Sequence, residues 1–455
     1  LEVFEAREPG RVGIYVCGPT VYDECHLGHA RALVAFDVIV RWLEQRGYRV
    51  LYVRNITDID DKIIARAAER GMTCPELAEK YIRSFREEMG KLSLRPPDVE
   101  PRATAHIPEM IALIGALWEK GFAYESGGDV YYDVGRFPGY GRLSGRETAD
   151  LVAGARVEVS ERKRNPLDFV LWKAAKPGEP EWRSPWGPGR PGWHVECSAM
   201  SARYLGKSFD VHGGGHDLIF PHHENEIAQS EAANGLAPAR YWLHNAHVTV
   251  DKTKMSKSLG NFFTLRDLVG KGYDPMTIRY ELLTAHYRKQ LNFTLEGLEQ
   301  SKAALDRIST FVDRLRKMSL QPGATEPVKQ ILASSLVEFE AAMNDDLNVP
   351  GALGATFEMI KPLTPLAEGK ELGEEGRDAI LITLRGMDAV RGVRWPVLET
   401  EAGDEDAEIG ALVGERTEAR KQRNFARADE IRSLLDDRGI ILEDGPEGTL
   451  WRRKH

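Results

Sequence analysis

The sequence predicts an α/β protein built on a parallel sheet of the Rossmann type, and two observations lead to this prediction. In the first hundred residues two β-rich runs, RVGIYV and RVLYVR, alternate with stretches in which apolar residues recur at helical spacing. The same alternation returns further along, in SFDVHGGG and YWLHNAHVTV. Because strand and helix alternate, we expect parallel strands with helices as the crossovers.

Each element carries its own signal. RVGIYVCGP ends in a Gly-Pro turn, and a helical pattern then runs from Gly28 to Arg46. After the second strand, DIDDKIIARAAERG starts with acidic residues and ends at Gly71, as a helix does. Residues 122–184 are short aromatic, Gly-rich and Pro-rich pieces, which favour an insertion of antiparallel strands. From Thr264 onward we expect an almost wholly helical chain.

At 455 residues the chain is long enough for several domains. We expect a Rossmann-like catalytic domain in two halves, a connective insertion, a loop-bearing region, a helical bundle and a small C-terminal domain. Their boundaries are expected, in chain order, at 1–121 and 191–250 for the two catalytic halves, 122–190 for the insertion, 251–299 for the loop-bearing region, 300–398 for the bundle and 407–455 for the C-terminal domain.

Composition restricts the class of function. Hydrophobic residues make up 42% and charged residues 29%, the balance of a soluble globular protein. The formal net charge of −9 repels nucleic acid as a whole, so a polyanionic partner must meet a local basic patch. Four cysteines are too few for a disulfide scaffold, which indicates a reducing compartment and a cytoplasmic protein.

No membrane association is expected. The most apolar early run, LVAFDVIVRWL, is interrupted by Asp37 and Arg41 and cannot span a bilayer. No signal peptide is visible, and because the chain begins at Leu1 rather than at a methionine, we expect a short N-terminal piece to be missing.

Four residues are candidates for a metal site. In PHHENEIAQ the proline is expected at a helix start, so that His222 and Glu226 share one helical face and His223 points elsewhere. Two ligands do not close a zinc site, and Cys17 and Cys197 are the candidate thiolates. Spacing leaves an alternative open: each cysteine is a small buried hydrophobe, and the histidine and glutamate form only a helical hydrogen bond.

Two motifs suggest a nucleotide site. HLGH lies where a strand turns into a helix, the place where backbone N–H groups and the helix dipole receive phosphate. His26 and His29 can donate to phosphate oxygens, and Gly28 allows close approach to the backbone. Far along the chain, KMSKS places Lys254 and Lys257 in a loop suited to clamping a polyphosphate.

A glycine turn supplies a third nucleotide signal. HGGGHDLIFPHH contains Gly215 and, just after it, Asp217, a carboxylate suited to ribose hydroxyls at a strand end. Each motif alone has a plain alternative, such as a pair of surface histidines or a solvated basic loop. Their order on one α/β pattern favours the nucleotide site.

The assembled motifs resemble those of class I aminoacyl-tRNA synthetases, with Leu27 in HLGH where isoleucine is commoner. The chain is most similar to the cysteinyl-tRNA synthetase family, and the similarity extends to LEDGP and WRRK in the tail. The segments that match that family's order are YVCGPTVYD, NITDIDDKI, YGRLSGR, DFVLWK, PGWHVECSAM, GGGHDLIFPHHENEIAQ and KMSKSLGNF.

The resemblance implies one zinc ion held by Cys17, Cys197, His222 and Glu226. Its task would be the choice of amino acid, because a cysteine thiol binds zinc as thiolate whereas a serine hydroxyl ionises far less readily. Proofreading is therefore not expected.

The same resemblance implies the remaining substrate contacts. Thr57 and Trp193 would flank L-cysteine, with core packing as the alternative role of the indole. The substrate carboxylate attacks the α-phosphorus of ATP, so no protein nucleophile is needed. The residues implied to contact ATP, with magnesium, or its transition state are His26, Gly28, His29, Gly215, Asp217, Lys254 and Lys257.

The C-terminal half is implied to bind tRNA. Residues 251–299 would contact its stem, the helical bundle would also bind it, and residues 407–455 would recognise the anticodon of the tRNA for cysteine. The protein is expected to be a monomer. Phe425 stands where relatives can carry tryptophan. The phenylalanine ring can still stack on a base, but its area is smaller. A solvated helix face is the alternative for each charge. The implied contacts are Arg420, Phe425, Asp429 and Asp444.

The sequence thus indicates a ligase that activates L-cysteine with ATP and transfers it to the 3′ end of its tRNA. The nearest alternative is the cysteine:aminosugar ligase of the mycothiol pathway, which gives no reason for a tail with Arg420 and Asp429. A zinc hydrolase explains neither HLGH nor KMSKS. A non-catalytic RNA-binding relative has no need of intact catalytic histidines and lysines.

Overall fold

The computed structural model describes residues 2–145, 162–255, 261–317, 326–368, 372–393, 404–422, 424–438, 440–445 and 448–453. The chain divides into two compact units, residues 1–394 and 395–455.

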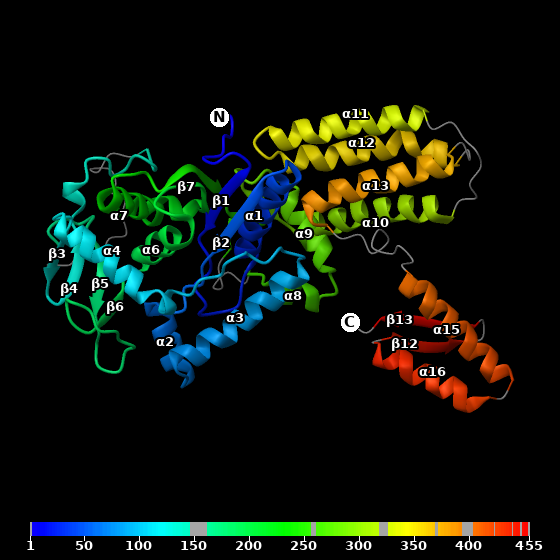
Figure 1. Ribbon diagram of the computed structural model, residues 1–455, viewed down its shortest axis with the longest axis horizontal. Helices are drawn as coiled ribbons and strands as arrows, with labels where there is room; N and C mark the ends of the chain where they lie inside the picture. The colour runs from blue at the N-terminus through cyan, green and yellow to red at the C-terminus, as the bar shows by residue number, and fades with distance from the viewer. Residues whose placement is uncertain are drawn as a thin grey trace. The chain divides into compact units, whose positions relative to one another are not determined.

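The first unit is built on a four-stranded sheet with the order β2-β1-β7-β8 (Figure 1). All neighbouring strands are parallel, so the predicted Rossmann-type sheet is confirmed. The order reverses between β1 and β7, and in such sheets ligands bind beyond the carboxyl ends of the two strands at the reversal. The strands are β1 (Arg11–Val16), β2 (Arg49–Arg54), β7 (Phe209–Gly215) and β8 (Ala239–Asn245).

Helices cover both faces of this sheet because side chains alternate along its strands. Ile14 and Val16 of β1 pack against Phe36 of α1 (Leu27–Gln45). Tyr15 belongs to the core on the opposite face, together with Met110. The helices that contribute to this second core are α4 (Ile107–Glu119), α6 (Trp193–Leu205) and α7 (Glu224–Asn234), while α2 (Asp61–Arg70) and α3 (Cys74–Lys91) follow β2.

The insertion is a separate antiparallel sheet with the order β3-β4-β5-β6, as predicted. It lies between α4 and α6 in the chain, and Figure 1 shows it on the side of the first unit away from α1. Its strands are β3 (Ala123–Ser126), β4 (Asp129–Tyr132), β5 (Phe169–Ala174) and β6 (Gly189–Pro191).

The expectation of an almost wholly helical chain after Thr264 is only partly right. The helices α8 (Leu265–Gly270) and α9 (Pro275–Leu283) are followed by β11 (Leu291–Phe293), which pairs with β9 (Val248–Val250) in a sheet that also holds β10 (Thr253–Lys254). Leu291 and Phe293 are buried and Asn292 is exposed. Three residues of alternation are too few to be recognised beside long helical patterns.

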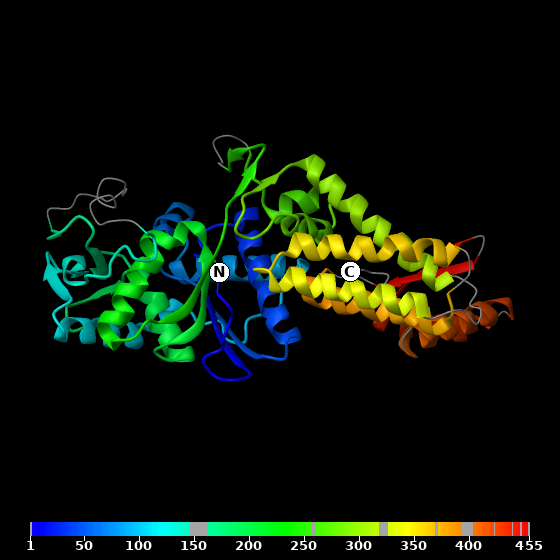
Figure 2. The same cartoon turned by 90° about the horizontal axis from the view of Figure 1, so that it is seen from above.

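Four long helices then form a bundle, and Figures 1 and 2 both show them side by side. Arg279 of α9 is fully buried and connects the bundle to helix α1. Its guanidinium donates both to Asp37 of α1 and to the Arg391 carbonyl at the end of the bundle. The helices are α10 (Leu295–Lys317), α11 (Glu326–Asn344), α12 (Val349–Glu368) and α13 (Glu374–Arg391).

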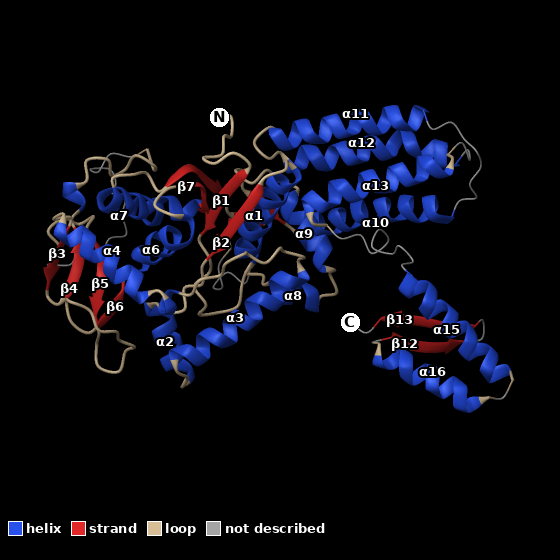
Figure 3. Ribbon diagram, in the orientation of Figure 1, coloured by secondary structure: helices blue, strands red, loops and turns tan. Residues whose placement is uncertain are grey.

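The second unit consists of two helices and a hairpin (Figure 3). Its core gathers Ile409, Val413, Ile431, Leu435 and Ile440. The hairpin is a second departure from the helical expectation. The elements are α15 (Asp404–Lys421), α16 (Phe425–Asp437), β12 (Ile440–Gly445) and β13 (Gly448–Arg453).

The start of α7 also differs from the prediction. Pro221 does not begin this helix; it lies in a kinked turn of π-helical type, Ile219–His223, and α7 starts at Glu224. Phe220 has extended dihedral angles, as expected of a residue that precedes proline. Among the described helices, none is both long and apolar enough to cross a membrane.

Candidate functional site

The β1–β7 crevice brings together the four candidate metal ligands. Cys17 follows β1, Cys197 lies in α6, His222 in the π-helical turn and Glu226 in α7. One ligand atom from each lies within 4.8 Å of the other three. Cys17 Sγ is 3.6 Å from both Cys197 Sγ and Glu226 Oε1. His222 Nε2 is 3.2 Å from Glu226 Oε1. We call these four residues the Cys17 cluster.

These separations fit one tetrahedral zinc ion. Bonds of about 2.3 Å to sulfur and about 2.0–2.1 Å to nitrogen or oxygen place two sulfurs about 3.8 Å apart, sulfur and oxygen about 3.6 Å, and nitrogen and oxygen about 3.3 Å. The observed 3.6, 3.6 and 3.2 Å agree with these values. The same three distances can arise from hydrogen bonds of Cys17 and from the contact of His222 with Glu226, but a single tetrahedral ion accounts for all four ligand atoms together.

A second group overlaps the first. His212 of β7 and His223 join Cys17 and Glu226 in a set whose ligand atoms also lie within 4.8 Å of one another. His223 Nε2 is 3.4 Å from Cys17 Sγ, so the expectation that His223 points elsewhere is wrong. It took only the four-residue spacing into account, but His223 lies three residues before Glu226, and this spacing also brings two side chains to one face of a helix.

The charges of the Cys17 cluster offset one another. A hydrogen bond from Cys17 lowers the pKa of Cys197 to about 6, whereas burial raises the pKa of Cys17 well above its usual value. Burial opposes ionisation of both His222 and Glu226, but it is outweighed. Hydrogen bonds with Cys197 and Glu226 raise the pKa of His222 to about 10, and His212 and His222 hold the pKa of Glu226 well below its usual range.

A further histidine orients His222. The Nδ1 atoms of His222 and His194 lie 3.0 Å apart. Burial lowers the pKa of His194 well below its usual value, so this ring is neutral and can accept a hydrogen bond from the other. Metal-bound histidines commonly donate their second ring N–H to such a partner, which fixes the tautomer.

HLGH forms the first turn of α1. His26 caps this helix, and its Nδ1 accepts from the Gly28 N–H at 3.0 Å. His29 Nδ1 accepts from the His26 backbone N–H at 3.4 Å. Each Nδ1 is therefore an acceptor, so a neutral ring of either histidine carries its proton on Nε2. Burial lowers the pKa of His29 to about 3, which keeps its imidazole neutral.

The absence of a side chain at Gly28 leaves room for the His26 ring, in addition to allowing a ligand to approach the backbone. A Cβ at this position would lie 2.8 Å from His26 Cε1, so a side chain would displace the capping ring. The start of α1 is also bonded to the segment before α8, because the Leu27 N–H donates to the Phe263 carbonyl at 3.1 Å.

The remaining ATP candidates are placed as follows. Gly215 ends β7, and Asp217 follows it as an exposed carboxylate in a short turn beyond the carboxyl end of the sheet. Lys254 ends β10, and its side chain lies outside the part of the chain that is described. Lys257 lies wholly outside the described residues.

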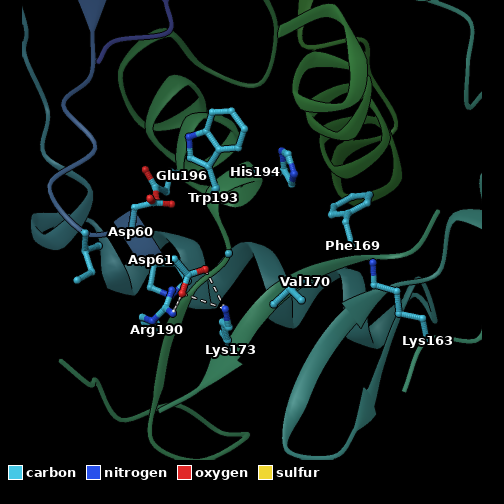
Figure 4. Close-up of a pocket in the computed structure, with 13 residues that line it drawn as sticks. Asp60, Asp61, Lys163, Phe169, Val170, Lys173, Arg190, Trp193, His194 and Glu196 are labelled. Atoms are coloured by element: carbon cyan, nitrogen blue, oxygen red, sulfur yellow. Dashed lines mark hydrogen bonds and ion pairs between the residues drawn. The ribbon is translucent and has the colours of Figure 1, made fainter. Parts of the chain in front are cut away.

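A cavity of about 250 Å³ lies beside Trp193. Figure 4 shows Trp193, His194 and Glu196 above a wall that includes Asp61 of α2. Trp193 is 38% exposed and its ring centroid lies 4.2 Å from that of His222, so it is not a core residue.

Thr57 does not border this cavity. It is 1% exposed, and its hydroxyl donates to Glu196 Oε2 at 2.7 Å. Burial raises the pKa of Glu196 well above its usual value, and the charge of Cys197 adds to this.

The anticodon candidates lie in the second unit. Arg420 and Asp429 are exposed on α15 and α16, and Phe425, the first residue of α16, is 60% exposed. Asp444 lies in β12, and its side chain is outside the described part of the chain.

Sequence reasoning missed several residues around the site. His212 and Glu196 lie in segments whose motifs had been recognised, VHGGG and WHVEC, but only the ligand candidates were selected from them. His194 and Asn55 likewise carry no signal of spacing, because their partners come from distant segments.

Comparisons with known proteins show the family of the chain. The family described as "tRNA synthetases class I (C) catalytic domain" matches residues 3–303, a DALR domain matches 338–384, and the cysteinyl-tRNA ligase anticodon binding domain matches 402–452. The cysteine–tRNA ligase of Alkalilimnicola ehrlichii is 52% identical over 461 residues, which cover 100% of this chain and 97% of the relative. That of Thioalkalivibrio sulfidiphilus is 51% identical over 456 residues, or 99% of this chain and 97% of the relative.

The fold is found in solved structures of other synthetases. Methionyl-tRNA synthetase of Mycobacterium tuberculosis, in complex with methionyl-adenylate, superposes with a TM-score of 0.63 at 16% identity, covering 92% of this chain and 96% of that one. Both the full-length identity to the curated relatives and the catalytic-domain match lead to one conclusion: the chain belongs to the cysteinyl-tRNA synthetase family of class I.

Proposed function

We propose that this chain, a cysteine–tRNA ligase by family, selects L-cysteine at a zinc ion held by the Cys17 cluster and activates it with ATP. The observation that carries the proposal is the spacing of that cluster, which suits a tetrahedral metal, at the end of the strand that leads into HLGH. Amino-acid choice and nucleotide chemistry then take place at two ends of one loop, residues 17–29.

Ligand chemistry favours the Cys17 cluster over the overlapping set. Cys17, Cys197, His222 and Glu226 provide two thiolates, the soft ligands that zinc prefers, whereas the set with His212 and His223 provides one. When bound, zinc supplies a soft acceptor for the substrate thiolate that a serine hydroxyl does not match. His212 and His223 would then support the ligands from behind, as outer partners do in metal sites.

The nucleotide side would use donors that the fold already directs. The Nε2–H groups of His26 and His29 would donate to phosphate oxygens of ATP, which carries magnesium, at the start of α1. Asp217, with Gly215 beside it, would accept from the ribose hydroxyls. Lys254 and Lys257 would neutralise the charge that develops on pyrophosphate as it leaves.

Protein groups would then position the reaction rather than form a bond to the substrate. The cysteine carboxylate attacks the α-phosphorus, pyrophosphate leaves, and the ribose hydroxyl at the 3′ end of the tRNA later displaces AMP from cysteinyl-adenylate. Trp193, exposed at the cavity beside His222, is suited to cover the bound amino acid.

The tail would read the anticodon of the tRNA for cysteine. Arg420, Asp429 and the exposed ring of Phe425 are candidates for that contact, with Asp444. We further propose that the protein acts as a monomer. We also propose that it acts in the cytoplasm, in keeping with its few cysteines and with the free state of all four in the structure.

Cysteine-dependent exchange of labelled pyrophosphate into ATP tests the proposal, with serine as the control amino acid. We expect exchange with cysteine and at least a hundredfold less with serine. Absence of exchange with cysteine would reject every adenylate-forming ligase, including the aminosugar ligase. Deletion of residues 404–455 distinguishes a tRNA ligase from the aminosugar ligase. Unchanged cysteine transfer would indicate a small acceptor, whereas loss of tRNA charging with retained exchange supports the tRNA ligase.

A further inference from the structure

We propose that Glu196 receives the ammonium group of the amino-acid substrate, an inference that rests on the proposed activation of cysteine. Glu196 stands between Trp193 and Cys197 in α6 and borders the 250 Å³ cavity (Figure 4). Neighbouring residues of a helix face different directions. Cys197 is turned to the Cys17 cluster, and Glu196 to the cavity.

A line of hydrogen bonds fixes Glu196. Asn55 Oδ1 accepts from the Gly18 N–H at 2.9 Å, which orients the amide so that Nδ2 faces Thr57 Oγ1 at 3.4 Å. The Thr57 hydroxyl uses its single proton to donate to Glu196 Oε2 at 2.7 Å. Asn55 Oδ1 also lies 3.7 Å from Cys197 Sγ, so the line connects the thiolate side of the site with Glu196.

The other oxygen of Glu196 is left for a ligand. Within the described residues it takes part in no hydrogen bond or ion pair, although the side chain is 99% buried, with a residue exposure of 1%. A buried carboxyl group is costly when no donor or cation offsets it. A cavity that borders such a group is therefore suited to a ligand that carries hydrogen-bond donors and positive charge.

The acids next to Glu196 favour a cation there, although Lys163, Lys173 and Arg190 also line the cavity. Asp58 and Asp60 add negative charge next to Glu196. No lysine, arginine or histidine of the described residues forms an ion pair with any of these three acids, whereas Asp61, one residue further on, is paired with both Lys173 and Arg190. Asp61 is therefore neutralised by protein cations, whereas the neighbouring acids Asp60 and Glu196 form no ion pair within the described residues.

Cysteine has the matching chemistry. Its ammonium group and its thiol stand on neighbouring carbon atoms, and the cavity that Glu196 borders adjoins the Cys17 cluster, because Trp193 and His194 of its lining contact His222. The thiol would be selected at the metal, while the ammonium group would be selected by Glu196. The hydrogen bond from the Thr57 hydroxyl holds Glu196 in place for this contact. Glu196 is thus a second specificity determinant that distinguishes amino acids from other thiols.

Inhibition of cysteine-dependent pyrophosphate exchange by two thiols tests this role. Cysteamine has the ammonium group without the carboxylate, and 3-mercaptopropionate has the carboxylate without the ammonium group. In Glu196→Gln we expect the KM for cysteine and the inhibition constant of cysteamine to rise by about tenfold or more, the usual loss for a charged hydrogen bond, while that of 3-mercaptopropionate changes less than about twofold.

Asp61→Asn is the matched control, since it removes a carboxylate from the same cavity that is already ion-paired. This variant should leave the ratio of the two inhibition constants unchanged. Equal weakening of all three thiols by Glu196→Gln, or weakening of 3-mercaptopropionate alone, would overturn the assignment.

The unmodified protein provides a second test in case Glu196→Gln fails to fold. Cysteamine should inhibit at least about tenfold more strongly than propane-1-thiol, in which a methyl group replaces the ammonium group. Equal inhibition would overturn the role of Glu196 while exchange with cysteine persists. Absence of exchange in the unmodified protein would instead overturn the proposed function itself.

Discussion

The candidate residues of the Cys17 cluster and those of the second unit lie in opposite surroundings, one buried and the other exposed. In the cluster, Cys197, His222 and Glu226 are each at most 2% exposed, and their ligand atoms lie at metal-binding separations. In the second unit the candidate contacts lie on the surface, with Phe425 60% exposed. The first region is organised by the protein core, whereas the candidate contacts of the second are exposed to solvent.

This difference has an energetic consequence. A buried group that loses a partner leaves charge or hydrogen-bonding capacity unsatisfied, so one substitution disturbs the whole cluster. An exposed ring loses only its own contact with the ligand. Substitutions in the cluster should therefore affect the first chemical step strongly, and substitutions in the second unit should affect only the tRNA-dependent step.

The largest effect is expected from Cys197→Ser. A hydroxyl is a poor zinc ligand, so bound zinc should fall to less than about one tenth and the KM for cysteine should rise by about a hundredfold. Metal analysis and pyrophosphate exchange measure both quantities. Cys74→Ser, at the first residue of α3, is the control and should change neither. If both quantities are unchanged in Cys197→Ser, Cys197 is not part of the site.

His29→Asn should separate nucleotide chemistry from amino-acid choice. Loss of the Nε2–H donor should lower the rate constant of exchange by about a hundredfold, the usual cost of one transition-state donor, with zinc content unchanged. His247→Asn, an exposed histidine outside HLGH, is the control. A fall in zinc content in His29→Asn would mean that the two ends of the 17–29 loop are not independent.

Phe425→Ala should have a smaller effect, limited to tRNA. Loss of a stacking ring is expected to raise the KM for tRNA by about tenfold and to leave cysteine-dependent exchange as it is. Leu434→Ala removes another exposed apolar side chain, 41% exposed, from the same helix and should not change tRNA aminoacylation. An equal change in both variants would indicate a loss of stability of the second unit rather than a contact.

The smallest effect concerns Glu88, which is buried like Glu226 but lacks imidazole partners. Both carboxyl oxygens of Glu88 are without a hydrogen bond in the described structure, and the nearest cation, Arg266, has its Nε 3.8 Å away. Burial, with the charge of Glu24, raises the pKa of Glu88 from about 4.5 to about 7. Glu226 shows the opposite shift, because two histidines outweigh the same burial.

The sign of the pH effect follows from this raised pKa. The folded protein holds a proton on Glu88 that the unfolded chain releases, so stability falls as pH rises from about 4.5 to about 7 and is level above that. Glu88→Gln should remove this part of the pH dependence and raise the midpoint of thermal unfolding at pH 8 by roughly 2–4 °C. Thermal melts of both proteins from pH 5 to pH 8 with the same slope would contradict the assignment.

Much of the fold and part of the site could be predicted from the sequence. The parallel sheet and the antiparallel insertion follow from local patterns, since helical and strand periods differ. Cys17, Cys197, His222 and Glu226 could be selected because ligand chemistry limits the residue types.

The rest depends on distance in space. The contact of His223 with Cys17 could not be predicted, because the two residues are 206 positions apart in the sequence. The link from Asn55 through Thr57 to Glu196 joins segments about 140 residues apart in the sequence, so periodicity carries no trace of it. The short strand β11 was missed because three residues give too little pattern.

Zinc X-ray absorption spectroscopy with and without cysteine tests the central claim most directly, that the Cys17 cluster holds the metal that selects the thiol. Without substrate, the account predicts zinc with two sulfur ligands, from Cys17 and Cys197, at about 2.3 Å. Added cysteine should raise the number of sulfur ligands to three, and added serine should leave it at two. A sulfur count that cysteine does not change would contradict the account.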